Sequence, residues 1–148
     1  MIPIKPSDAI WTDEQWNAIY DKGHNIIVSA GAGSGKTAVL SERVIENLKS
    51  GMSIKEVLLL TFTKAASLEM KTRIRNKIKK NPSLSKELSL IDEAYITTFD
   101  SFALSIVKKY HYLFNISRNI KIIDSNVINL KKEEIITYGR KQPHISDI

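Results

Sequence analysis

A glycine-rich segment in the first quarter of the chain carries the residues best suited to chemistry. Residues 30–37 read Ala-Gly-Ala-Gly-Ser-Gly-Lys-Thr, which differs from the strict phosphate-binding motif only in having Ala30 in place of Gly. Glycines let several backbone N–H groups turn toward one centre, and a following helix adds partial positive charge. The Lys36 ammonium can neutralise phosphate oxygens, and the Thr37 hydroxyl is a suitable Mg²⁺ ligand. We therefore expect ATP and Mg²⁺ to be bound by Ala30, Gly31, Ala32, Gly33, Ser34, Gly35, Lys36 and Thr37.

The segments on both sides of this loop favour the elements that would position it. Residues 25–29 form a short apolar run that predicts a strand, and residues 36–48 have the apolar periodicity of a helix that stops near Gly51. Upstream, Thr12 and Gln15 have the spacing of a capping box, which predicts a helix starting near Thr12. A glycine turn that merely joins strand to helix is the alternative. Agreement of the flanking elements with the Gly-Lys-Thr sequence favours nucleotide binding.

The rest of the chain alternates between strand and helix patterns. Further strands are expected at 56–62, 95–99 and 120–123, and helices at 64–80, 84–91, 102–110 and 126–138. The continuous apolar run in 56–62 is typical of a strand covered on both faces. This order predicts an α/β fold with a parallel sheet and crossover helices.

One helix accounts for the whole net charge of +6. Of the 22 Lys and Arg, seven lie between residues 64 and 80, with one of the 16 Asp and Glu, so the remainder is neutral. Met70, Ile74 and Ile78 form an apolar stripe that Ala66 extends, whereas the cations, among them Lys71, Arg75 and Lys79, lie on a different face. An anionic partner, nucleic acid or a partner subunit, is expected to meet this cationic face.

Composition excludes several classes of protein. The chain of 148 residues has no Cys, which rules out disulfides, thiolate metal sites and cysteine nucleophiles. The three His show no metal-ligand spacing, no apolar run has the length of a membrane span, and the N-terminus lacks the apolar region of a signal peptide. We expect a cytoplasmic protein that does not bind membranes.

Four segments, in this order, resemble motifs of one family. Residues 12–15, 30–37, 61–70 and 97–102 are similar to the Q motif and motifs I, Ia and Ib of UvrD/Rep-type superfamily 1 DNA helicases. The opening at residues 11–16 and the stretch at 108–114 are most similar to the AddA branch of helicase-nuclease subunits. The resemblance covers roughly residues 10 to 135. It implies a P-loop NTPase (RecA-like) fold, with residues 1–124 as the incomplete domain 1A and residues 125–148 as the next subdomain or a frayed tail.

The resemblance also implies roles for matched residues. Gln15 would recognise adenine, because a carboxamide both donates and accepts; the alternative is that it only caps its own helix. Single-stranded DNA would be contacted by Thr61, Phe62, Thr63, Lys64, Thr98 and Ser101. Phe62 has a core position as its alternative. Asp100 stands where the family has His, so it either repels phosphates or caps the following helix. Further implied partners are the remainder of the helicase and an AddB-like nuclease subunit.

Residues 88–94 imitate a second nucleotide motif. Leu-Ser-Leu-Ile-Asp-Glu-Ala has the form of a Walker B strand, but only two residues separate Glu93 from the next strand, too few for a parallel crossover. Without a true Asp-Glu motif, the chain is expected to be a fragment that binds nucleotide, hydrolyses little ATP and does not unwind DNA for repair or recombination. The alternatives are a small P-loop kinase using Asp92 or Asp100 with a lid carrying Arg118 or Arg140, and a non-catalytic DNA-binding module.

Overall fold

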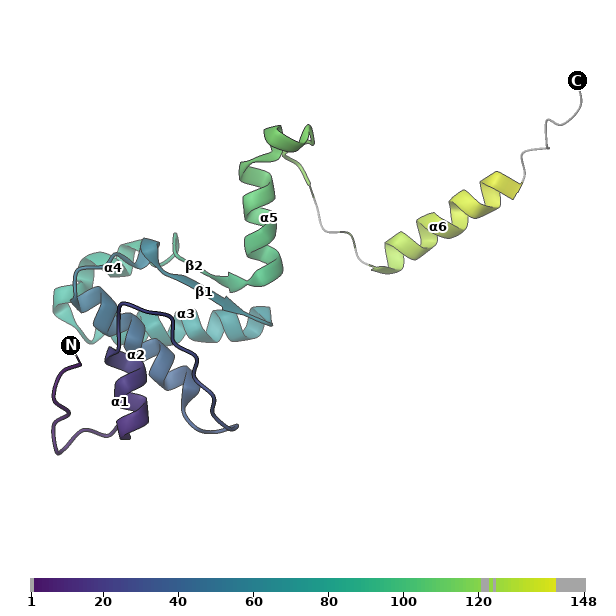
Figure 1. Ribbon diagram of the computed structural model, residues 1–148. Helices are drawn as coiled ribbons and strands as arrows, with labels where there is room; N and C mark the ends of the chain where they lie inside the picture. The colour runs from purple at the N-terminus through teal and green to yellow at the C-terminus, as the bar shows by residue number, and fades with distance from the viewer. Residues whose placement is uncertain (1, 121–122, 124, 141–148) are drawn as a thin grey trace, which may run out of the picture. The chain divides into compact units, whose positions relative to one another are not determined.

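The computed structural model describes residues 2–120, 123 and 125–140, and the chain divides into two units between Ser105 and Ile106. In chain order the elements are α1 (Asp13–Tyr20), α2 (Lys36–Lys49), β1 (Leu58–Thr61), α3 (Lys64–Lys79), α4 (Ser85–Leu90), β2 (Tyr95–Thr98), α5 (Phe99–Lys109) and α6 (Ser125–Arg140) (Figure 1). Single 3-10 turns lie at Ile54–Glu56, Pro82–Leu84 and His111–Phe114. No helix within the described ranges is both long enough and apolar enough to cross a membrane.

Local hydrogen bonds fix the helix starts where the sequence predicts them. The Thr12 hydroxyl accepts from the Gln15 N–H (3.3 Å) and the Gln15 Oε1 accepts from the Thr12 N–H (3.0 Å), which confirms the capping box. The Thr63 hydroxyl caps α3 by accepting from the Ala66 N–H at 3.1 Å. α2 ends just before Gly51, whose φ of 96° suits glycine.

The sheet consists of two parallel strands. β1 pairs with β2 in a register that sets Leu58 opposite Tyr95 and Thr61 opposite Thr98, and α3 is the main crossover helix. Leu59 and Ile96 on one face are buried in the same apolar cluster as the α3 stripe. On the other face Leu58 is 46% exposed, so the prediction that this strand is covered on both faces is wrong for the described chain.

The core lies between α2, α3 and the covered face of the sheet. Met70, Ile74 and Ile78 are buried, as the stripe predicts. Burial of each such side chain contributes about 1.5–3 kcal/mol. The stripe is extended by Ser67, which is buried, whereas Ala66 is exposed. The prediction that Ala66 extends the apolar stripe is therefore wrong. Ser67 occupies that place, because it lies three residues before Met70 and shares its helix face.

The strand expected at residues 25–29 is missing from the sheet. Residues 25–29 form no strand, and Ile27 is 95% exposed. A strand needs a neighbour for its backbone groups, and no described segment pairs with this one. In 120–123, residues 121 and 122 lie outside the described residues, and Ile120 and Ile123 are irregular. The helices expected at 84–91, 102–110 and 126–138 correspond to α4, α5 and α6.

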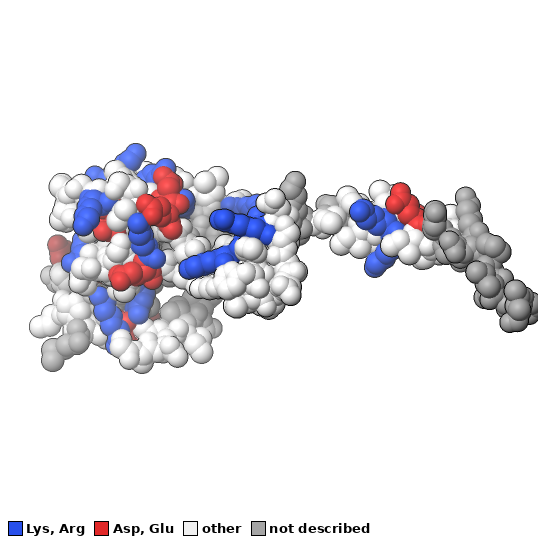
Figure 2. Space-filling model, turned by 90° about the horizontal axis from the view of Figure 1, so that it is seen from above, with Lys and Arg blue, Asp and Glu red and all other residues white. Residues whose placement is uncertain are grey.

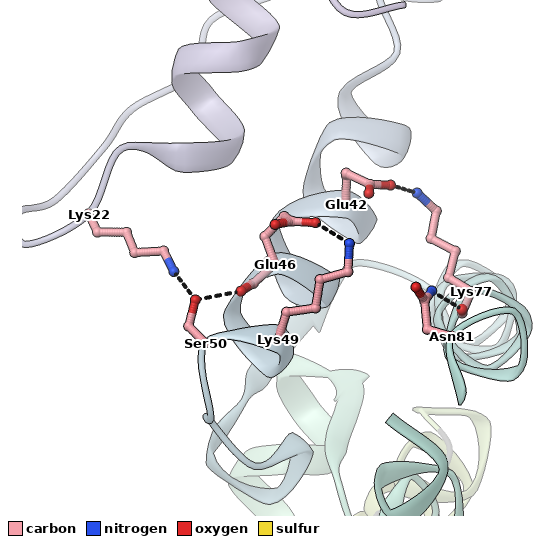
Figure 3. Close-up of polar contacts among 7 residues, drawn as sticks. All are labelled: Lys22, Glu42, Glu46, Lys49, Ser50, Lys77 and Asn81. Atoms are coloured by element: carbon pink, nitrogen blue, oxygen red, sulfur yellow. Dashed lines mark hydrogen bonds and ion pairs between the residues drawn. The ribbon is translucent and has the colours of Figure 1, made fainter. Parts of the chain in front are cut away.

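Polar contacts fasten α2 to its neighbours (Figure 3). Glu42 of α2 forms an ion pair with Lys77 of α3, both side chains being about three-quarters buried. On the other side of α2, the Lys22 ammonium donates to the Ser50 hydroxyl at 2.9 Å, and this hydroxyl donates to the Glu46 carbonyl at 2.7 Å. α2 is thereby held from both sides, which fixes the helix that the glycine-rich loop precedes.

Candidate nucleotide and nucleic-acid sites

The glycine-rich loop ends in a helix start without a side-chain cap. Gly33 (φ 77°) and Gly35 (φ 81°) have left-handed backbone conformations that only glycine adopts easily. Gly35 is the N-cap of α2, and no side chain of the described residues accepts from the first N–H groups of this helix. In α1 and α3, by contrast, Thr12 and Thr63 fill this role. The first turn of α2 is therefore open to an external anion.

Lys36 folds back across the loop. Its ammonium donates to the carbonyls of Ala30 and Gly31, both at 2.6 Å. Thr37, the next residue, is exposed on the first turn of α2. The cation and the hydroxyl that phosphate and Mg²⁺ would need thus lie at the same end of one helix.

Gln15 joins α1 to the same loop. While its Oε1 caps α1, its Nε2 donates to the Ser34 carbonyl at 3.1 Å. A Cβ built on Gly35 would lie 3.3 Å from this Nε2, so glycine lets the side chain approach. Capping is therefore one of two roles that this side chain has, and the second is contact with the loop.

A pocket of about 460 Å³ lies beside the loop, between α1 and α2. Its lining includes Glu14, Gln15, Val28, Ser34, Lys36 and Arg43. The pKa of Glu14 is lowered, mainly by a hydrogen bond from the Glu14 backbone N–H to the carboxylate and secondly by a hydrogen bond with the Thr12 side chain.

Arg43 lines this pocket too, and it binds the end of α1. Its Nη1 donates to the carbonyls of Ala18 (2.8 Å) and Ile19 (3.3 Å). Sequence reasoning missed Arg43 and Glu14 as site residues. The available signals were the position of Arg43 two turns after Lys36 and that of Glu14 beside Gln15.

The carboxyl ends of the two strands bring together the hydroxyl residues expected to contact DNA. The Thr61 hydroxyl donates to the Thr63 carbonyl at 2.9 Å and lies 2.6 Å from the Ser67 hydroxyl. In the neighbouring strand the Thr98 hydroxyl donates to the Ser101 hydroxyl (2.9 Å) and accepts from the Ser101 N–H (3.3 Å). These hydroxyls thus organise the strand-to-helix turns from which the exposed groups project.

Thr98 therefore caps α5, and the interpretation of Asp100 as the cap is wrong. The helix begins at Phe99, which places Asp100 inside its first turn instead of before it. A carboxylate there still suits the positive end of the helix.

Exposed aromatic and cationic side chains follow these turns. Phe62 is fully exposed, so its alternative as a core residue is wrong. Phe99 is 67% exposed and directly follows β2, just as Phe62 directly follows β1. Sequence reasoning did not name Phe99 as a candidate DNA contact, although its position at the end of a predicted strand matches that of Phe62. Lys64 lines a groove of about 290 Å³ between α3, β2 and α5. The remaining lining residues are Ser67, Leu68, Lys71, Ile96, Thr97, Thr98 and Ser101.

Much of the charge on α3 is neutralised within the chain. Lys71 and Arg75 both contact Asp92, at 3.0 and 2.6 Å, Arg73 pairs with Glu69, and Lys77 with Glu42. On the visible face of the first unit, acidic side chains lie among the basic ones (Figure 2). The cationic face of α3 is therefore only partly free, and its contact with an anionic partner stays a prediction. Within the described residues Lys64, Lys79 and Lys80 have no ion pair.

Asp92 is not the end of a strand. It lies in the turn that follows α4 and is 72% exposed. Of residues 88–94, only 88–90 are helical and 91–93 form the turn, so no strand precedes the Asp-Glu pair. A hydrogen bond from Lys71, assisted by the charge of Arg75, lowers the pKa of Asp92.

These features define an α/β protein with a two-stranded parallel sheet flanked by helices and a glycine-rich loop at a helix start. The model of the UvrD/REP helicase N-terminal domain matches residues 11–146. The chain therefore belongs to the UvrD/REP helicase N-terminal domain family.

Curated relatives named as ATP-dependent helicase/nuclease subunits of the A type have similar sequences. The relative from Lysinibacillus sphaericus is 43% identical over 145 residues, covering 91% of this chain and 12% of the relative. Those from Anoxybacillus flavithermus and Listeria innocua are 42% and 40% identical, covering 92% and 91% of this chain and 12% of each relative. The chain thus spans about an eighth of the length of these relatives. Their sequence identity to this chain confirms the resemblance to the AddA branch. Membership of a helicase family leaves the small-kinase alternative without support.

Proposed function

We propose that this chain is the ATP-binding N-terminal piece of a DNA helicase of the UvrD/AddA type. The observation that carries the proposal is the junction of Gln15, the glycine-rich loop and the uncapped start of α2 beside one pocket. On this proposal the fold is RecA-like, and residues 1–124 belong to domain 1A.

The nucleotide would occupy the loop and the adjoining pocket. Backbone N–H groups of the loop and of the first turn of α2 would hold the phosphates, and the Lys36 ammonium would exchange the carbonyls of Ala30 and Gly31 for phosphate oxygens. Thr37 would hold Mg²⁺, which supplies positive charge to the β and γ phosphates. Gln15 would read the adenine edge with its carboxamide. The donor set fits a nucleoside triphosphate because it combines open N–H groups, one free hydroxyl and one ammonium.

Single-stranded DNA would lie across the carboxyl ends of β1 and β2. Phe62 and Phe99 offer exposed rings for base stacking, and Lys64 offers a charge for the backbone. The turns that present them are built by the hydroxyls of Thr61, Thr63, Thr98 and Ser101. Thr98 is buried and donates to Ser101, whereas the hydroxyls of Thr63 and Ser101 accept within the turns and keep a proton for a phosphate oxygen. The parent protein would couple ATP hydrolysis to movement along this strand and would pair with an AddB-like nuclease subunit.

We expect the chain itself to bind nucleotide with little hydrolysis. Among the described residues Glu14 is the only carboxylate that lines the pocket, and Asp92 is engaged by α3. No further carboxylate of the described chain lines the pocket to activate the attacking water, and Arg43 is held by the carbonyls of Ala18 and Ile19 at the end of α1. We therefore expect the described residues to lack the main contributions to phosphoryl transfer.

Binding of a fluorescent ATP analogue to the purified chain tests this proposal. Lys36→Ala should weaken binding at least tenfold because it removes a charge that the phosphates need, whereas Lys22→Ala, which loses a contact to Ser50 away from the pocket, should not. Equal affinity of the Lys36→Ala variant and the wild type would contradict nucleotide binding at this loop. DNA-stimulated ATP hydrolysis that Lys36→Ala abolishes would contradict the expected inactivity.

Phe62→Ala tests the DNA surface. Loss of one stacked base costs about 1–3 kcal/mol, or roughly 5- to 150-fold in affinity for an oligothymidylate. Because Phe62 is fully exposed, the free energy of unfolding should stay within about 0.5 kcal/mol of the wild type. DNA binding that responds to neither Phe62→Ala nor Lys64→Ala would place the DNA elsewhere. DNA binding with no nucleotide binding would instead favour the non-catalytic module.

A further inference from the structure

Asp92 joins the α4–β2 turn to the cationic face of α3. One of its carboxylate oxygens lies 3.0 Å from the Lys71 ammonium and 2.6 Å from the Arg75 guanidinium. Lys71 and Arg75 are one helical turn apart, a rise of about 6 Å, so both can grip one anion. Lys71 and Arg75 are thus arranged as an oxyanion-binding subsite, and the anion that they bind is the Asp92 carboxylate of the same chain.

The turn does not depend on this carboxylate for its shape. Ile91, directly before Asp92, is fully buried, and the Glu93 N–H donates to the Leu90 carbonyl at 3.0 Å. Glu93 itself pairs with Lys55 at 2.6 Å. Asp92, by contrast, is 72% exposed, and ion pairs of this kind contribute little to folding stability. Another anion can therefore replace the carboxylate at low cost.

The two cations continue the surface assigned above to DNA. Lys71 lines the groove at the strand ends together with Lys64, Thr98 and Ser101. Lys64, Lys71 and Arg75 are seven and four residues apart, which places them on one side of α3. A strand of nucleic acid that crosses the ends of β1 and β2 and turns along α3 would meet them in this order.

We propose that Lys71 and Arg75 form a binding subsite for the phosphodiester backbone of single-stranded DNA, and that the Asp92 carboxylate occupies this subsite when DNA is absent. The inference rests on the proposed binding of DNA at the strand ends. It gives the residues that imitate a Walker B strand a role unrelated to Mg²⁺: Asp92 competes with phosphate and so limits the affinity for DNA.

The test is the salt dependence of oligothymidylate binding by the full chain, followed by fluorescence anisotropy. Each phosphate contact steepens the slope of log affinity against log salt by about 0.7 for single strands. Asp92→Asn should therefore tighten binding and steepen the slope by about 0.7 to 1.4. The ratio of the DNA affinity of the Asp92→Asn variant to that of the wild type should therefore fall about 3- to 7-fold between 50 and 200 mM salt. Asp92→Ser, which also lacks the charge, provides a second variant should the first fold poorly.

Glu93→Gln is the matched control, because it changes the net charge equally but releases Lys55 instead of the subsite. It should leave the slope unchanged. Adding Lys71→Gln and Arg75→Gln should abolish the gain of the Asp92→Asn variant, yet the same two changes should cost the wild type little. The proposal would be overturned if Asp92→Asn and Glu93→Gln changed the DNA affinity and the salt slope equally. It would also be overturned if the double change Lys71→Gln and Arg75→Gln lowered the DNA affinity of the wild type and of the Asp92→Asn variant by the same factor.

The Phe62→Ala variant distinguishes failure of the subsite from failure of the DNA surface. Tight binding that Phe62→Ala weakens and Asp92→Asn leaves unchanged refutes the subsite alone. Binding that Phe62→Ala does not weaken refutes the DNA surface at the strand ends, and a chain that binds no DNA as wild type or as Asp92→Asn refutes both.

Discussion

The exchange Gln15→Glu separates the two roles of Gln15. A glutamate retains the oxygen that accepts from the Thr12 N–H, so the capping box survives. It loses the Nε2 donor to the Ser34 carbonyl and presents a carboxylate to that carbonyl and to any adenine N7. We therefore expect a variant that folds well and binds ATP poorly.

The expected magnitudes come from the contacts that change. The hydrogen bond to Ser34 is exposed, so its loss costs about 0.5–1.5 kcal/mol of stability. A negative charge in the first turn of α1 returns about 0.3–1 kcal/mol. The free energy of unfolding should thus change by less than about 1 kcal/mol. Loss of the donor to adenine, with a carboxylate facing the N7 lone pair in its place, should cost about 1–3 kcal/mol of binding, or roughly 5- to 150-fold in ATP affinity.

Two assays on the same samples decide the matter. Urea unfolding gives the stability, and competition of ATP and GTP against a fluorescent nucleotide gives affinity and base preference. Gln15→Ala is the comparison, because it lacks both the cap and the carboxamide and should lose stability as well as ATP preference. An unchanged ratio of ATP to GTP affinity in both variants would refute adenine recognition and leave Gln15 as a helix cap.

Three further changes follow from the geometry. Gly35→Ala combines the strain of a left-handed alanine, about 1–2 kcal/mol, with a Cβ 3.3 Å from Gln15 Nε2, so it should lower both stability and ATP affinity. Arg43→Met should cost about 1–3 kcal/mol in urea unfolding because it leaves two carbonyls at the end of α1 without their charged donor. A hydrogen bond from Lys71 and the charge of Arg75 lower the pKa of Asp92. The stabilisation of the fold by this pairing should be fully present above the pKa of an unfolded aspartate and should be lost as the pH falls through the lowered pKa of the folded state. NMR titration of the Asp92 carboxyl measures that lowered pKa.

Each of these has its own control. Gly51→Ala has a similar φ of 96° but open space around the added Cβ, so it should reduce stability without touching ATP affinity. Arg73→Ala breaks only an exposed pair within α3 and should change stability by less than about 0.5 kcal/mol. In the Lys71→Gln variant the Asp92 midpoint should move up toward its ordinary value, and a midpoint that stays put would contradict the assigned cause.

Features that depend on neighbours in the sequence were predictable. The capping box needs only Thr12 and Gln15, and the α3 stripe needs only helical periodicity, so both are confirmed. The start of α2 at Lys36 also follows from local signals, since the glycines before it cannot favour a helix. The error at Ala66 is of another kind: a small apolar residue and a serine can both occupy a helix face, and packing selects between them.

Features that depend on distant partners were not predictable. Residues 25–29 have the apolar composition of a strand, but composition supplies no neighbour for their backbone groups. The clamp on Asp92 joins residues 17 positions or more apart, so the charge count along α3 could not show how many cations are already engaged. The exposure of Phe62 likewise follows from the end of β1 and the start of α3 and not from the residue itself. Nucleotide and DNA binding by the site residues stay predictions.

The two-stranded sheet has a consequence for hydrogen exchange. In a parallel pair, alternate residues of each strand direct their N–H groups toward the partner strand and the others point away from it. Because β1 and β2 have only each other among the described strands, amide protons along Leu58–Thr61 should alternate between slow and fast exchange. A polypeptide that adds at the free edge of β1 would slow the fast set, so the exchange pattern along β1 reports whether a further strand lies beside it.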